Sequence, residues 1–250
     1  MINKEKLNNL TNEIWKSAER LRGKFKAYEY QTVLMPMIVI RRLECVLIDG
    51  RDLMAKEKRA NQPDITDEAL AEFIKKKELS RQNPLPFHNT TEWTLKKISD
   101  EDPTLMEKHF RDYIKGFSEN LQEIINKFDF RAVIGQMVAK DRLAAIINQY
   151  ATEHLGPNNI SNLEMGYVYE ELLRRFSEQS GEEAGEHFTP REVIRLMVEL
   201  LDIQVHDKRI SIYDPACGTG GMLSVAKEHL LEKAKDEVER EKLDKLTTLY

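Results

Sequence analysis

The chain has 250 residues, and its 38 lysines and arginines against 43 aspartates and glutamates give a formal net charge of −5. A negative balance disfavours a protein that grips duplex DNA alone, because such proteins present a basic face to the phosphates. The start is polar, and no apolar stretch approaches the roughly 20 residues of a membrane span, so we expect a globular cytoplasmic protein without a signal peptide.

Cysteine and histidine usage excludes two further classes of protein. The two cysteines, Cys45 and Cys217, lie far apart and cannot build a disulfide framework. This pattern fits a reducing compartment. The six histidines show no metal-ligand spacing, so we predict no metal site.

The N-terminal part of the chain is predicted to be helical. Apolar residues at helical spacing predict a helix over residues 3–22. They also predict one or two buried helical segments from Tyr28 to Ile48, where Pro36 can introduce a kink. Thr66 is expected to cap the next helix. The elements expected after it are a short strand over 91–95, one helix over 105–128, and one or two helices over 129–150.

A glycine- and proline-containing stretch, Leu155–Asn159, predicts a linker. We therefore expect a first domain over residues 1–155 and a second over 156–250. The second begins with the capping box Ser161–Glu164, which opens a helix. Near the end of the chain, residues 222–246 are predicted to form one long helix.

The most informative stretch is Ile210–Leu223. A strand, an acidic residue (Asp214), a glycine-rich turn and a helix start follow one another, as they do in the nucleotide pocket of a Rossmann-like sheet. A phosphate-binding loop requires a lysine after its last glycine, but Met222 stands there. The dinucleotide fingerprint requires a third glycine, but Leu223 stands there.

S-adenosylmethionine suits this loop better than a nucleotide does. It has no phosphate, and its amino group and sulfonium are cationic, so the carboxylate of Asp214 attracts it. The glycines leave room for its methionine moiety. A tight turn that binds no ligand is the alternative interpretation.

A second segment, residues 185–193, strengthens the ligand interpretation. Thr189 is predicted as the N-cap of a helix, with Pro190 at its first position and Glu192 three residues after the cap. Phe188 precedes the cap, as a hydrophobic staple against Val193 or as a platform for an adenine ring. The helix is expected to carry an apolar face made of Val193, Ile194, Leu196, Met197, Leu200 and Leu201.

Together the two segments resemble the modification (M) subunit of type I restriction-modification systems, the adenine-N6 DNA methyltransferases. In that family a Gly-x-x-(Phe/Tyr)-Thr-Pro-Arg segment precedes an Asp-Pro-x-x-Gly-Thr-x-Gly loop by about this distance. The resemblance implies that the matching residues bind S-adenosylmethionine. They are Glu186, His187, Phe188, Thr189, Pro190 and Arg191 in the first segment, and Asp214, Pro215, Ala216, Gly218, Thr219, Gly220 and Gly221 in the second.

The opening of the chain is also similar to that family, from the amphipathic first helix to the basic pair Arg41-Arg42. The resemblance therefore covers the whole chain, but only the N-terminal part of the family. It implies a mainly α fold, in which a helical N-terminal domain precedes the first elements of a Rossmann-like α/β methyltransferase domain. The partners it implies are DNA, the specificity subunit, the restriction subunit and a second M subunit.

Two features of the family are missing. Residues 246–250 look like the start of the second strand, whose terminal acidic residue would hold the ribose hydroxyls. The Asn/Asp-Pro-Pro-aromatic tetrapeptide, which binds the flipped adenine, does not occur, so no catalytic residue is assigned. We reject Asn83–Phe87 as a substitute, because Leu85 separates its prolines and it precedes the glycine loop. We expect this chain alone to bind S-adenosylmethionine weakly or not at all, and not to methylate DNA.

Two hypotheses of different classes follow. In the first, the chain is part of a DNA methyltransferase and forms half of its cofactor pocket. In the second, it is an interaction module whose helical domain docks onto DNA, the specificity subunit or another M subunit without any cofactor role.

Overall fold

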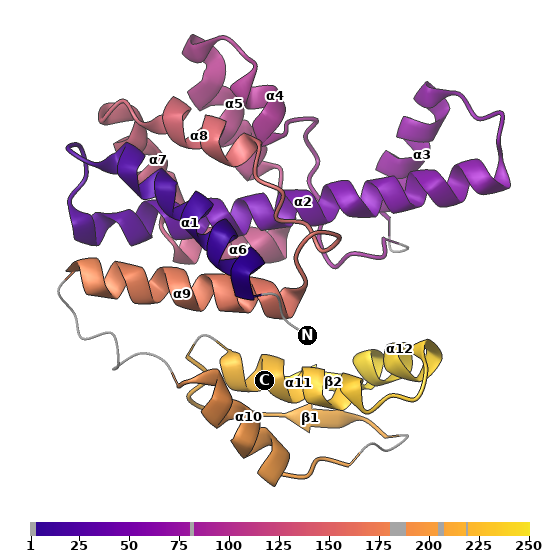
Figure 1. The fold of residues 1–250 in the computed structure, drawn as a ribbon. Coiled ribbons are helices and arrows are strands. Elements are labelled where there is room, and N and C mark those ends of the chain that lie inside the picture. The colour runs from indigo at the N-terminus through magenta and orange to yellow at the C-terminus, as the bar shows by residue number, and fades with distance from the viewer. Residues whose placement is uncertain (1–3, 81–82, 181–188, 205–207, 219) are drawn as a thin grey trace. The chain divides into compact units, whose positions relative to one another are not determined.

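The computed structural model describes residues 4–80, 83–180, 189–204, 208–218 and 220–250 (Figure 1). The chain forms two compact units, a larger one of Asn8–Ser161 and a smaller one of Met1–Leu7 together with Asn162–Tyr250. Helices dominate both units, and the smaller unit also contains a pair of strands. This architecture confirms the predicted fold class. Across the described ranges, no helix has the length and apolar character needed to cross a membrane.

In the part that the structure describes, the regular elements of the larger unit are helices. Its elements are most of α1 (Lys4–Leu21), the 3-10 turn η1 (Ala27–Glu29), α2 (Tyr30–Asn61), α3 (Asp67–Glu78), α4 (Leu95–Ser99), α5 (Pro103–Lys115), α6 (Glu119–Lys127), α7 (Phe130–Ala139) and α8 (Leu143–Ala151). α2 runs through the unit, and α3 folds back along its C-terminal half (Figure 1). The predicted N-cap of α3 is confirmed, since the Thr66 hydroxyl oxygen accepts a hydrogen bond from the Ala69 amide at 3.3 Å.

α2 is longer than the sequence predicts, since it continues past Ile48 to Asn61. Pro36 lies inside this one helix. Its buried part carries three charged residues, Arg41, Arg42 and Glu44. Arg41 forms an ion pair with Glu44, and its Nε donates to the Glu153 carbonyl at 2.6 Å. The second carboxylate oxygen of Glu44 accepts the Leu95 amide at 2.8 Å and so fixes the start of α4.

Arg42 holds the segment in which the sequence predicts the domain boundary. Its Nη1 donates to the carbonyl of Ile160 at 2.8 Å and also to that of Leu155. The side chains of Leu155 and Ile160 are fully buried. This stretch therefore packs as part of the larger unit, and domain bounds of 1–155 and 156–250 stay a prediction.

The single helix predicted over residues 105–128 is wrong, because α5 and α6 are separate helices. The three residues between them bond to a distant loop instead of continuing the helix. The Gly116 carbonyl accepts the Thr90 amide at 2.8 Å, and the Ser118 amide donates to the His88 carbonyl at 3.0 Å. A Cβ at position 116 would lie 2.4 Å from Oδ1 of Asn89, so this approach requires glycine.

The strand predicted over residues 91–95 is also wrong. The last of these residues, Leu95, starts α4. The Thr94 hydroxyl oxygen accepts the Lys97 amide at 3.1 Å and caps this helix. The β-branched residues favour a strand here, but Thr91 lies in a loop and Thr94 caps the helix.

The smaller unit contains α9 (Asn162–Ser180), α10 (Arg191–Leu200), β1 (Ile210–Ile212), α11 (Gly221–Glu232), α12 (Glu237–Leu246) and β2 (Thr247–Leu249). The strands pair in parallel, with Ile210 opposite Thr247 and Ile212 opposite Leu249. The strand expected at the end of the chain is thus confirmed. Its parallel pairing requires a crossover connection, which α11 and α12 form.

The single helix predicted over residues 222–246 is wrong, because a side-chain cap at Asp236 starts a new helix. The Asp236 carboxylate accepts the Glu239 amide at 2.8 Å, and the Glu239 carboxylate accepts the Lys235 amide at 2.7 Å. The Asp236 side chain thus satisfies one of the amides that the first turn of a helix leaves unpaired, and the Glu239 side chain fixes the chain just before the helix.

α10 packs against α11 around a small core formed by Ile194, Val198, Val225 and Ala226. The predicted apolar face of α10 is only partly buried. Its other members, which are Val193, Leu196, Met197, Leu200 and Leu201, are exposed. The apolar surface of this helix extends around more than one side, and α11 covers one side of it.

The buried ion pair of α2 generates a stability prediction. Glu44→Ala leaves the Arg41 guanidinium buried without its carboxylate, so we expect a loss of about 3–5 kcal/mol. Urea unfolding followed by tryptophan fluorescence measures it, since both tryptophans, Trp15 and Trp93, lie in the larger unit. The exposed pair of Lys16 with Glu13 supplies the control, because Glu13→Ala should change the stability by less than about 1 kcal/mol. Equal effects of the two substitutions would contradict the prediction.

Candidate functional site

The glycine-rich loop leaves the carboxyl end of β1, as predicted, and leads into α11. Its start is tied to the neighbouring strand, because the Asp214 amide donates to the Tyr250 carbonyl at 3.0 Å. The Asp214 side chain is half-buried, and its Oδ1 accepts the Ala216 amide at 3.0 Å. The carboxylate is thereby held at the mouth of the turn.

Backbone conformation explains two of the glycines. Gly218 and Gly220 have φ values of +51° and +77°, in the left-handed region that glycine enters without a Cβ penalty. Gly220 occupies the N-cap position of α11. A Cβ at Gly220 would meet nothing within 4 Å, so its requirement for glycine is conformational. The buried Gly221 then begins the helix.

The segment before α10 is only partly described. Glu186, His187 and Phe188, and also Thr219 of the glycine loop, lie outside the described residues. The two roles suggested for Phe188 therefore stay predictions.

Thr189 is not the N-cap of α10. Pro190 takes that position with an extended backbone, φ −55° and ψ 138°, and its carbonyl accepts the amides of Val193 and Ile194. Proline has no hydroxyl or carboxylate with which to cap the helix, so α10 begins without a side-chain cap.

Arg191 is the first residue of α10 and is buried, with 6% of its side chain exposed. Its guanidinium forms two parallel bonds to the Glu170 carboxylate of α9, from Nε at 2.7 Å and from Nη2 at 2.9 Å. The guanidinium carbon lies 4.0 Å from the ring centroid of Tyr167. Its remaining nitrogen, Nη1, is buried and has no hydrogen-bond partner among the residues that the structure describes.

The residues on α9 that receive Arg191 were not found from the sequence. Gly166, Tyr167 and Glu170 share one side of that helix, but nothing in their spacing indicates a partner in the next helix. A Cβ at Gly166 would lie 2.6 Å from Nη2 of Arg191. The glycine therefore makes room for the guanidinium.

Charged residues line a hollow in the smaller unit, between α10 and α11. Its polar lining residues are Arg195, Glu199, Glu228, His229 and Glu232. Burial, followed by the neighbouring charge of Glu232, raises the pKa of Glu228. Within the part of the chain that the structure describes, no group of His, Cys, Asp and Glu side chains has the arrangement to hold a metal ion.

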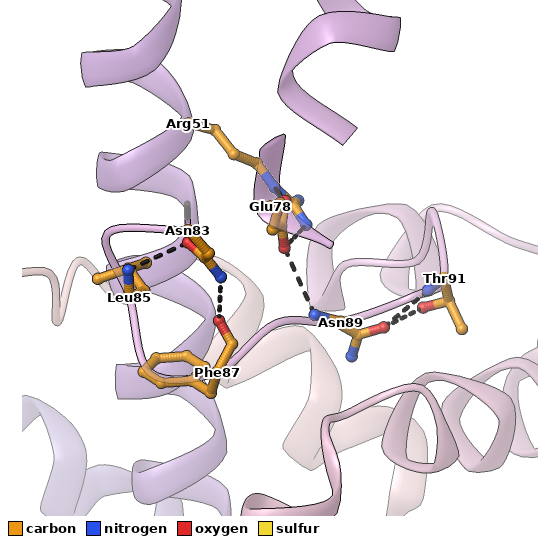
Figure 2. Close-up of polar contacts among 7 residues, drawn as sticks. All are labelled: Arg51, Glu78, Asn83, Leu85, Phe87, Asn89 and Thr91. Atoms are coloured by element: carbon orange, nitrogen blue, oxygen red, sulfur yellow. Dashed lines mark hydrogen bonds and ion pairs between the residues drawn. The ribbon is translucent and has the colours of Figure 1, made fainter. Parts of the chain in front are cut away.

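Figure 2 shows the segment that we rejected as a substitute for the catalytic tetrapeptide. The side-chain amide of Asn83 donates to the Phe87 carbonyl at 3.0 Å, and its Oδ1 accepts the Leu85 amide at 3.0 Å. Both ends of this amide are used inside its own loop. Further along, Asn89 connects Glu78 to Thr91. The contacts are those of a structural loop.

Comparisons with known proteins match both parts of the chain. Residues 10–149 match the HsdM N-terminal domain, and residues 161–243 match the N-6 DNA Methylase family. The methylase subunit of the type I restriction enzyme MjaIX from Methanocaldococcus jannaschii is 26% identical over 241 residues, which cover 90% of this chain and 40% of that protein.

Two further relatives carry the same description. The MpnII methylase subunit of Mycoplasma pneumoniae is 22% identical over 88% of this chain and 44% of its own length. The EcoEI methylase subunit of Escherichia coli is 48% identical over 65 residues, which are 26% of this chain and 12% of that protein. The chain thus spans less than half the length of these relatives.

The left-handed backbone at Gly220 generates a second prediction. Gly220→Ala should destabilise the smaller unit by about 1–2 kcal/mol, because a Cβ is disfavoured at positive φ. Gly220→Asn should cost less, since asparagine tolerates this region. Thermal unfolding followed by far-ultraviolet circular dichroism compares the two. An alanine variant as stable as the parent would contradict the conformational argument.

Proposed function

The chain belongs to the methylase-subunit family of type I restriction enzymes, and we propose that its smaller unit forms one side of an S-adenosylmethionine pocket. The observation that carries this proposal is the loop after β1, in which the Ala216 amide fixes the Asp214 carboxylate and Gly220 stands at the N-cap of α11. In α/β folds, ligands bind at the carboxyl ends of the strands. Asp214 and Gly220 stand at such an end.

The chemistry of the loop fits the ligand. The α-amino group and the sulfonium are cationic, and the Asp214 carboxylate compensates that charge. The carboxylate of the methionine moiety would find the backbone amides of the first turn of α11 and the positive end of the α11 dipole. The turn at Gly218 and Gly220 keeps side chains away from the path of the ligand.

When bound, S-adenosylmethionine supplies an electrophilic methyl group. We propose that the complete protein transfers this methyl to the N6 amino group of adenine in DNA, in the cytoplasm and together with a specificity subunit, a restriction subunit and a second M subunit. The match to the N-6 DNA Methylase family supports the reaction. The two cysteines, Cys45 and Cys217, are both free, which fits a reducing compartment. These 250 residues contain no Asn/Asp-Pro-Pro-aromatic motif, so we expect no methyl transfer from them alone.

One observation favours an assembly module without a cofactor role, although it places the contact on the smaller unit and not on the helical domain. The outer side of α10 exposes a row of apolar side chains, with Leu200 75% exposed and Leu201 66% exposed. Surfaces of this kind mark contacts with other polypeptide. Cofactor binding by the chain separates the two candidates.

Calorimetric titration with S-adenosylhomocysteine tests the pocket. Asp214→Asn keeps an oxygen for the turn to Ala216 but removes the charge, so we expect at least about a tenfold loss of affinity. Asp214→Ala, which also removes the turn, should abolish binding.

Glu241→Ala is the control, because it removes an exposed carboxylate of the same unit, paired with Lys245, and should leave the affinity unchanged. Absence of binding by the unsubstituted chain would favour the assembly module. Equal affinities of the Asp214→Asn variant and the parent would remove the charge argument.

A further inference from the structure

We propose that Glu170 is a positioning residue for the cofactor pocket, because it holds Arg191 and thereby fixes the start of α10 against α9. In this arrangement Arg191 is an anchor and not a contact of the cofactor. Only the expected effect on cofactor affinity rests on the proposed function. The anchor itself is argued from the contacts between α9 and α10.

Arg191 stands in an unfavourable position for helix stability alone. A cation at the first residue of a helix faces the positive end of the helix dipole. Burying a guanidinium adds a desolvation penalty of several kcal/mol unless a carboxylate pairs with it. The Glu170 carboxylate offsets both costs, through two parallel bonds of 2.7 and 2.9 Å. Such bidentate pairs fix orientation as well as distance.

Three further features show that α9 is shaped to receive this side chain. Gly166 leaves the space that Nη2 occupies, since a Cβ there would lie 2.6 Å away. Tyr167 presents its ring to the guanidinium at 4.0 Å. The carboxylate of Glu170 is itself 19% exposed, so water screens the pair little. Guanidinium, ring and carboxylate form one cluster.

The cluster fixes the start of α10, as a side-chain cap does in other helices. Pro190 offers no side-chain cap, so the ion pair of the next residue fixes where the helix begins. Thr189 and Pro190 directly precede Arg191, and both are proposed to contact the cofactor. Loosening Arg191 would let the start of α10 fray and would displace these two residues.

Variants of the 250-residue chain separate an anchor from a ligand contact. Glu170→Gln removes the charge of the carboxylate with little change in shape. The double substitution Glu170→Met with Arg191→Met replaces the pair by apolar side chains of similar length, which buried ion pairs often tolerate. Glu171→Gln is the matched control, because Glu171 bonds Arg174 and Arg175 of its own helix.

Two readouts are compared. The first is amide hydrogen exchange at Val193 and Ile194, whose amides donate to the Pro190 carbonyl at 3.0 and 3.1 Å. The second is the affinity for S-adenosylhomocysteine. We expect Glu170→Gln to speed exchange and to lower the affinity, each by about tenfold or more, while the double methionine variant recovers both and Glu171→Gln changes neither.

Unchanged exchange in Glu170→Gln would overturn the anchor. Recovery of slow exchange without recovery of affinity in the double variant would also overturn the proposal, because Arg191 would then contact the cofactor itself. An unsubstituted chain that binds no S-adenosylhomocysteine would favour the assembly module over a pocket formed by these 250 residues, and the exchange readout would still decide the anchor.

Discussion

The larger unit depends on charges that α2 buries. A buried guanidinium or carboxylate costs several kcal/mol unless a partner compensates it. Arg41 and Glu44 pair with each other, and the three residues Arg41, Arg42 and Glu44 find further partners in segments far away along the chain, at residues 153–160 and at the start of α4. Because backbone carbonyls and one amide serve as partners, the charges specify where those segments must return. Apolar packing alone would leave that register open.

The same physical rule applies in the smaller unit, where Arg191 is buried at the start of α10 and the Glu170 carboxylate receives it. In both units a long helix presents or receives a buried charge, and a later segment is held by it. Exposed pairs such as Lys16 with Glu13 are different, since solvent screens them and each partner lies within a turn of the other.

Local signals in the sequence predicted the elements whose causes are local. The first helix, the Thr66 cap and the strand–turn–helix order around Gly220 follow from spacing, capping and backbone preference, and the structure confirms them. The break between α5 and α6 was missed because it arises from a loop 26 residues earlier, which approaches Gly116 too closely for any side chain. The break before α12 had a local signal, Asp236 with Glu239, that was hidden among neighbouring charges.

The residues of the candidate site also differ in whether their structural cause is local or distant in the sequence. Gly218 and Gly220 are required because their own backbone angles are left-handed, so the glycine pattern was enough to locate the turn. The buried charge of Arg191 is compensated by the carboxylate of Glu170, 21 residues earlier. A polar stretch of sequence separates Arg191 from the helix that carries this carboxylate. The resemblance to the family motif assigns the glycines and Arg191 the same role, which is cofactor binding. Burial and pairing distinguish them, because a side chain whose hydrogen bonds are already directed to its own protein has little left to offer a ligand. Within the described ranges, Nη1 of Arg191 has no partner, but this nitrogen is buried. The two nitrogens that carry the ion pair bond to Glu170 of α9.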